Sequence, residues 1–108
     1  MVEAVITDAM QERMDGGPVV FSANINKMTR TNEAQQRLLV LTALHNIYLF
    51  DGENLNRKHG ISRMSAIIRS TVSDEVVLIF PTSKDLRITG LDSAANQNLM
   101  TSVQEAFA

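Results

Sequence analysis

The spacing of apolar and polar positions first indicates a helix near the start of the chain. Apolar residues recur there at three- and four-residue steps, with polar and charged residues between them. The recurring positions are Val2, Val5, Ile6, Ala9, Met10 and Met14. The pattern predicts an amphipathic helix that ends at "DGGP", because the two glycines permit non-helical backbone angles and Pro18 forces its predecessor into an extended conformation.

A second pattern begins after Pro18, where short stretches rich in β-branched and aromatic residues follow one another at intervals of roughly ten residues. The seven stretches are "VVFSANINKMTR", "QQRLLVLT", "NIYLFD", "NLNRKHG", "MSAIIRSTV", "EVVLIFP" and "DLRITG". The separators "DGEN", "SDE" and "TSK" carry residues typical of turns. Connections this short leave no room for the crossover helices of a parallel sheet, so we expect sequential antiparallel strands.

The final stretch, "LDSAANQNLMTSVQEAFA", returns to a helical period. Asp92 or Ser93 has a side chain suited to an N-cap. The apolar positions that repeat are Leu91, Ala95, Leu99, Met100, Val103 and Phe107. Seven strands followed by one helix predict a mostly β (α+β) fold, a partly open antiparallel barrel in which the helix covers one open end and the loops at the other end stay free.

Two stretches, "RLLVLTALHNIYLFD" and "ISRMSAIIRSTVSDEVVLIFP", resemble the lipid-binding tail homology domain of class I myosins. The resemblance includes the "LT" that ends the second strand, the "YLF" of the third strand and the pattern "ISRMSAI". It covers about residues 18 to 107 and implies a pleckstrin homology-like fold, which the order of elements also favours. We therefore expect an N-terminal amphipathic helix and linker at residues 1–17 and a pleckstrin homology-like domain at residues 18–108.

In the family that the chain resembles, a lysine on the first strand and a basic residue, any residue and an arginine on the second strand grip inositol phosphates. Lys27 matches the lysine and Arg37 matches the arginine. The middle base is replaced by Gln35, and Glu33 adds a carboxylate to the same loop. Arg30, in the loop, is the candidate substitute for the missing base. The resemblance thus implies a phosphate site from which one of the expected cations has been lost.

A second basic cluster, "NRKHG", lies in the fourth predicted strand. In the expected fold, the hairpin of the third and fourth strands approaches the loop between the first two. Because side chains alternate along a strand, Arg57 and His59 should share one face while Lys58 points the other way. If His59 titrates near its usual pKa of about 6.5, its charge should strengthen phosphate binding in mildly acidic conditions.

These bases can also be ordinary solvated charges. Charges on strand edges prevent edge-to-edge pairing, and charges beside a hairpin turn are common on protein surfaces. Further bases are expected to lie farther from the proposed rim and to serve as spacers or edge charges. They are Arg63, Arg69, Lys84 and Arg87.

Composition narrows the class of protein. A chain of 108 residues, 44% of them hydrophobic, is enough for one core. Its formal charge of −2 argues against a nucleic-acid partner and restricts any anion binding to a local cluster. There is no cysteine, no signal-peptide pattern and no apolar run long enough to cross a bilayer. We expect a soluble cytoplasmic protein that can sit peripherally at a membrane or at the cytoskeleton.

The first predicted helix has three possible roles. It can pack on the barrel, pair with a second copy through its apolar face, or belong to a linker from a larger protein, so the oligomeric state stays open. A helix lying on a membrane is disfavoured, because its polar face carries Glu3, Asp8 and Glu12 against Arg13 alone.

The sequence gives no set of catalytic residues. His45 and His59 are its imidazoles, no local motif specifies a nucleophile or a phosphate loop, and Asp74 and Glu75 fit a hairpin turn. We therefore expect no enzyme activity, no metal site and no cofactor. Two functions remain: a module that binds phosphoinositides or anionic phospholipids for membrane targeting, or a protein-interaction or scaffolding module on a pleckstrin-like barrel that does not bind lipid.

Overall fold

The computed structural model describes residues 6–70 and 72–107. It contains seven strands, one α-helix before them and one after them in the chain, and one short 3₁₀ helix. In chain order the elements are α1 (Asp8–Glu12), β1 (Val19–Met28), β2 (Ala34–Thr42), β3 (Asn46–Asp51), β4 (Asn54–Gly60), η1 (Ile61–Arg63), β5 (Ala66–Arg69), β6 (Val76–Ile79), β7 (Leu86–Thr89) and α2 (Ser93–Phe107). The seven predicted strands and the C-terminal helix are confirmed.

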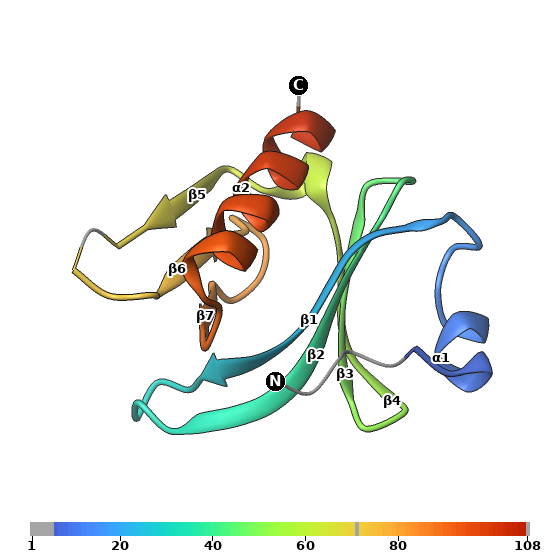
Figure 1. Ribbon diagram of the computed structural model, residues 1–108, viewed down its shortest axis with the longest axis horizontal. Coiled ribbons are helices and arrows are strands. Elements are labelled where there is room, and N and C mark those ends of the chain that lie inside the picture. The colour runs from blue at the N-terminus through green and yellow to red at the C-terminus, as the bar shows by residue number, and fades with distance from the viewer. Residues whose placement is uncertain (1–5, 71, 108) are drawn as a thin grey trace.

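All seven strands belong to one antiparallel sheet in the order β4-β3-β2-β1-β7-β6-β5. The sheet bends between β1 and β7, so that β1–β4 form one wall and β5–β7 the other (Figure 1). Helix α2 packs against β1 and η1 and covers the opening between the walls. Asp92 caps this helix by accepting a 2.8 Å hydrogen bond from the Ala95 amide. The expected partly open barrel with a C-terminal helix is therefore present.

Residues 38–42 of β2 and 47–50 of β3 are buried on both faces of the sheet, which explains the continuous apolar sequences there. Leu39, Leu41, Ile47 and Leu49 point into the main core, where they meet residues of β6, β7 and α2. The alternate side chains form a second cluster on the outer face of the sheet. Its buried members are Met10, Leu38, Val40, Tyr48 and Phe50, and Ile6, Met14 and Leu55 pack against them. A strand covered on both faces reads as an apolar run rather than as an alternation.

The N-terminal helix is shorter than its apolar spacing predicts. Val2 and Val5 lie outside the described residues, and α1 comprises the five residues from Asp8 to Glu12. Thr7 has an extended backbone and its hydroxyl accepts a hydrogen bond from the Met10 amide, so the helix begins after it. Ile6, Met10 and Met14 pack against the outer cluster. Of the three roles considered for this segment, intramolecular packing is observed.

Asp15 fixes the end of this N-terminal segment to the β2–β3 connection. Its Oδ2 accepts hydrogen bonds from Thr42 Oγ1 at 2.6 Å and Asn46 Nδ2 at 2.7 Å, and its Oδ1 accepts one from the Gly17 amide at 2.8 Å. Burial raises the pKa of Asp15, but these hydrogen bonds outweigh burial and lower it to about 2. Asp15 therefore holds α1 on the outer face of the barrel.

Among the helices described, none has the length and apolar character needed to cross a bilayer.

Candidate functional site at the barrel mouth

The end of the barrel where β1 joins β2 brings several basic residues together. We call this end the barrel mouth; it comprises residues 29–33, 52–53 and 80–85 and the strand ends next to them. These segments meet because β1 lies between β2 and β7 in the sheet and every pair is antiparallel. The predicted turn between β3 and β4 is also here, with Gly52 at a φ of 59°.

The β1–β2 loop has a defined shape, held by its own residues and by Arg87. The Thr29 amide donates to the Glu33 carbonyl at 2.9 Å, and the Glu33 amide donates to the Thr29 hydroxyl at 3.0 Å. Arg87 donates from Nη1 to Asn32 Oδ1 at 3.1 Å and forms a 3.0 Å ion pair with Glu75. Arg87, expected to be a spacer or edge charge, links this loop to β7 and to Glu75, the residue before β6.

Lys27 lies among the other cations of the mouth. Its Nζ donates a 3.3 Å hydrogen bond to Asn56 Oδ1. Burial lowers the pKa of Lys27, and the charges of Arg57, Arg37 and Lys84 lower it further. Three bases from β2, β4 and the β6–β7 loop therefore lie close enough to Lys27 of β1 to destabilise its charge. Such a cluster favours a negative charge at its centre.

Arg37 faces the interior of the barrel beside Lys27, and its side chain is only 14% exposed. Its Nη1 donates to the Gln36 carbonyl at 2.7 Å, its Nη2 donates to Gln35 Oε1 at 3.4 Å, and Nη1 lies 3.7 Å from Asp51 Oδ1. Its Nε is buried without a hydrogen-bond partner among the described protein atoms. Gln35 stands where the resemblance implies a base, and it pairs with Lys27 across the two strands. It adds no charge, and its Oε1 orients Arg37 by accepting the hydrogen bond from Nη2.

Arg57 and His59 lie on the inner face of β4, as the alternation of side chains predicts, and they form a direct contact. Arg57 Nε donates to His59 Nε2 at 3.0 Å, and the His59 ring stacks on Phe80 with centroids 4.2 Å apart. Burial lowers the pKa of His59, and the charge of Arg57 lowers it further. The hydrogen bond from Arg57 and the lowered pKa both disfavour the charged form of His59, on which its expected contribution to phosphate binding depends. Lys58 points outward, with Nζ 5.7 Å from the centroid of the Tyr48 ring.

Lys84 belongs to the basic cluster around Lys27, whereas the sequence predicts that it lies farther from the rim. Its carbonyl accepts a 2.6 Å hydrogen bond from Arg57 Nη2, which joins β4 to the β6–β7 loop across the mouth. The position of Lys84 follows from the pairing of β7 with β1. Lys27 pairs with Ile88, so the start of β7, which comes just after Lys84, lies next to the β1–β2 loop. Strand order along the sequence does not reveal this neighbour.

Arg30 occupies the tip of the β1–β2 loop and is exposed to solvent. The cations that lower the pKa of Lys27 are Arg57, Arg37 and Lys84, and Arg30 is not one of them. The structure thus brings together Lys27, Arg37, Arg57 and His59, and it places Arg30 at the edge of this group. A ligand held by Lys27, Arg37 and Arg57 has to extend outward along the β1–β2 loop to reach Arg30.

Two carboxylates partly neutralise the cluster. Asp51 pairs with Arg37. Burial lowers the pKa of Arg57, and the charge of Asp85 offsets part of that lowering. Across residues 6–70 and 72–107 no three His, Cys, Asp or Glu side chains are grouped so that they can hold a metal ion. The ammonium and guanidinium groups of the mouth are of the kind that form charge-assisted hydrogen bonds with anions.

Comparison with solved structures identifies the fold. The C-terminal pleckstrin homology domain of pleckstrin in complex with D-myo-Ins(1,2,3,5,6)P5 is similar with a TM-score of 0.73 and 10% identity, over 85% of this chain and 98% of that chain. The pleckstrin homology domain of the human pleckstrin homology domain-containing protein family A member 5 has a TM-score of 0.66 and 17% identity, over 88% of this chain and 81% of that chain. The linker-DH/PH domains of p115-RhoGEF have a TM-score of 0.68 and 9% identity, over 83% and 29%. The chain has the pleckstrin homology fold.

No protein-family model matches the sequence, and no curated protein matches it. At identities this low, the solved structures show the fold alone. The expected pleckstrin homology-like architecture is confirmed, and the narrower resemblance to class I myosin tails stays a prediction.

Proposed function

We propose that this chain is a non-catalytic module that binds the phosphorylated headgroups of phosphoinositides or other anionic phospholipids at the barrel mouth. Its residues for this role are Lys27, Arg37 and Arg57, joined by Lys84, with Arg30 at the periphery and His59 as a neutral support for Arg57. The proposed cellular setting is the cytoplasmic surface of a membrane, with peripheral contact.

The observation that carries the proposal is the convergence of three cations on Lys27. The pKa of Lys27 is lowered partly because Arg57, Arg37 and Lys84 destabilise its charge. A phosphate group placed among these side chains removes the repulsion and accepts charge-assisted hydrogen bonds from both ammonium and guanidinium groups. The mouth is thus charged before any ligand arrives, within a domain whose overall charge is negative.

The comparisons agree with this ligand class. Two of the similar structures are complexes of the C-terminal pleckstrin homology domain of pleckstrin with inositol pentakisphosphates, D-myo-Ins(1,2,3,5,6)P5 and D-myo-Ins(1,2,3,4,5)P5. They share the fold of this chain at 10% and 8% identity. Support for the proposal therefore comes from the fold together with the local charge of this sequence.

Co-sedimentation with liposomes tests the proposal. Vesicles of neutral lipid, with and without a few per cent phosphatidylinositol bisphosphate, are compared at about 50 and 300 mM salt, because screening weakens charge-driven binding. The double variant Lys27→Ala/Lys84→Ala removes two bases of the mouth. Lys58→Ala/Arg63→Ala removes the same charge from two exposed positions outside it.

We expect the chain to sediment with the phosphorylated vesicles at low salt and the mouth variant to lose at least tenfold in affinity, while the surface variant loses less than twofold. Absence of binding above the level of neutral vesicles contradicts the proposed function. Equal losses in both double variants show binding by diffuse charge and contradict the placement of the site.

A further inference from the structure

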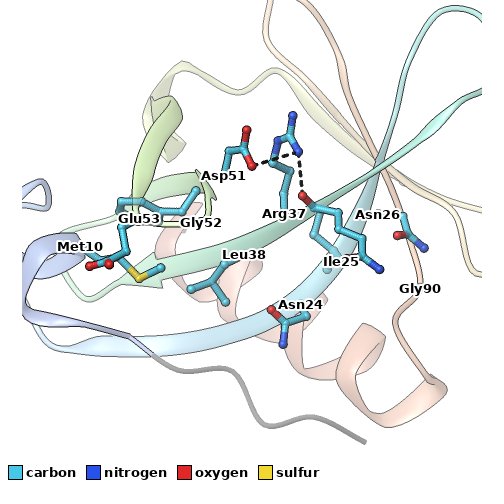
Figure 2. A pocket seen from close by; sticks show the side chains of 12 residues that line it. Met10, Asn24, Ile25, Asn26, Arg37, Leu38, Asp51, Gly52, Glu53 and Gly90 are labelled. Atoms are coloured by element: carbon cyan, nitrogen blue, oxygen red, sulfur yellow. Dashed lines mark hydrogen bonds and ion pairs between the residues drawn. The ribbon is translucent and has the colours of Figure 1, made fainter.

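A cavity of about 750 Å³ lies on the outer face of the sheet and borders the barrel mouth, from which Arg37 and Glu53 contribute to its lining. Figure 2 shows Met10 and Glu53 at one end, Leu38 near the middle, and Asn26 with Gly90 at the opposite end. We call this cavity the outer groove. It crosses four neighbouring strands, β3, β2, β1 and the end of β7. Its volume is in the range of sites that hold small ligands and short peptide segments.

The half of the outer groove nearer β1 is lined by side-chain amides without partners. Asn24 and Asn26 point to the outer face two positions apart on β1, and Gln36 lies opposite Asn26 on β2. Within the described part of the chain, none of these three amides makes a side-chain hydrogen bond to protein. An amide group offers both a donor and an acceptor, so this half suits a ligand with both, such as a peptide backbone.

The other half of the outer groove has an apolar floor. Leu38 is paired with Phe50 on β3 and with Asn24 on β1, so these side chains form one row across the outer face. Met10 of α1 closes the row and adds a flexible thioether that adapts to different apolar partners. This half suits a single aliphatic side chain.

Glu53 gives the apolar end a fixed negative charge. Thr7 Oγ1 donates a 2.7 Å hydrogen bond to Glu53 Oε2, which holds the carboxylate at the end of the groove. No cation among the described residues forms an ion pair with it. The nearby Arg37 is already engaged by Asp51, Gln35 and the Gln36 carbonyl. The carboxylate is therefore available to a cation from a ligand, and it disfavours a phosphate here.

We propose that the outer groove binds a short extended peptide segment of a partner protein. A lysine or arginine side chain of the segment pairs with Glu53, an apolar side chain packs on Met10 and Leu38, and the backbone beyond them bonds with the amides of Asn24, Asn26 and Gln36. Four strands at ~4.8 Å spacing give the groove a length of roughly 14 Å, which about four extended residues cover. Charge complementarity selects a basic peptide over an acidic one.

A display library of randomised six-residue peptides, screened against the full chain, tests this proposal. Selected peptides are synthesised, their affinities are measured by fluorescence anisotropy, and their sites are mapped from backbone amide shifts in NMR spectra. We expect selection of sequences with lysine or arginine close to an apolar residue, and shifts centred on Asn24, Gln36 and Glu53. Absence of selection, selection of acidic sequences, or shifts centred on Lys27 and Arg57 overturns the proposal.

Variants separate the outer groove from general charge effects. Glu53→Lys should weaken the selected peptide at least tenfold, whereas Glu105→Lys, the same change at an exposed position of α2, should change it less than twofold. Because Glu53→Lys also removes the bond from Thr7, Asn24→Ala/Gln36→Ala provides a second variant that leaves this bond in place, with an expected loss of about fivefold. Equal effects of the two charge reversals overturn the proposal.

Two further measurements separate peptide binding from self-association and from lipid binding. Sedimentation velocity of each variant reports self-association; if Glu53→Lys dissociates a dimer and leaves peptide affinity unchanged, the outer groove binds a second copy and the proposal is wrong. Liposome binding of the same variants should be unaffected or slightly stronger. A failure of the phosphoinositide proposal therefore appears with liposomes alone, and a failure of the peptide proposal appears with peptides alone.

Discussion

Arg57 donates its Nε hydrogen to Nε2 of His59 across 3.0 Å. Nitrogen Nε2 can accept this bond only when the imidazole is neutral and carries its proton on Nδ1. The ring is further held by its stack on Phe80. His59 therefore positions Arg57 at the mouth and does not itself supply charge, and this relationship sets how the site responds to pH.

We expect the pKa of His59, measured by an NMR titration, to lie below 6.5. In the unfolded chain His59 takes up its proton near pH 6.5, and in the folded chain it does so only at lower pH. The unfolded state thus binds more protons between these two values, so the free energy of unfolding should fall as the pH drops below about 6.5.

Urea unfolding at pH 7.5, 6.5 and 5.5 measures this contribution. The variant His59→Gln keeps an acceptor near Arg57 but does not titrate, so its stability should depend less on pH over this range. A measured His59 pKa at or above 6.5 contradicts the assignment of the neutral imidazole.

Asp15→Asn should destabilise the protein by roughly 2 kcal/mol at pH 7, because a pKa lowered from 3.8 to about 2 corresponds to about 1.4 kcal/mol per unit. The stabilisation is present above pH 4 and lost as the pH falls towards 2, since protonation removes an acceptor of Thr42 and Asn46. Denaturant unfolding at pH 7 and pH 3 measures both effects. Glu12→Gln, an exposed position on α1, serves as the control and should change stability by less than about 0.5 kcal/mol.

Asp51→Asn should strengthen anion binding at the mouth. Asp51 lies 3.7 Å from Arg37 Nη1 and competes with a phosphate for that guanidinium. The Asp51 side chain is 63% exposed, and exposed ion pairs contribute about 0.2–1 kcal/mol, so the gain should be roughly 1.4- to fivefold. Calorimetric titration with inositol hexakisphosphate measures it. Glu105→Gln changes the net charge equally at a remote site, and an equal gain there would assign the effect to overall charge.

Arg87→Met should loosen the β1–β2 loop. The substitution removes the hydrogen bonds to the Thr29 carbonyl and Asn32 and the ion pair with Glu75. Losing hydrogen bonds to a charged group costs about 1.5–3 kcal/mol each when buried, and less for this half-exposed side chain, so we expect about 1–2 kcal/mol in total. Hydrogen exchange should accelerate at residues 29–33 and stay unchanged in α2. Arg63→Met, at an exposed position, should accelerate neither segment.

The local sequence is enough to predict the positions of most strands and of the C-terminal helix along the chain. Alternation and turn residues give the seven strands within a few residues of their ends, and the apolar runs "RLLVLT" and "IYLF" reflect burial on both faces of β2 and β3. The apolar spacing predicts an N-terminal helix that includes Ile6, whereas Thr7 adopts the extended conformation of a cap and α1 begins after it. A capping residue overrides periodicity because its backbone is not helical.

Backbone periodicity is enough to predict the order and type of the strands, the C-terminal helix and the opposite faces taken by Arg57 and Lys58. It does not predict that Lys84 joins Lys27, Arg37 and Arg57, that Gln35 orients Arg37, or that His59 accepts a hydrogen bond from Arg57. Each of these depends on which distant segments become neighbours in the sheet and on how deeply a side chain is buried. Charge interactions depend on distance in space and on solvation, and neither quantity is recorded in the order of residues.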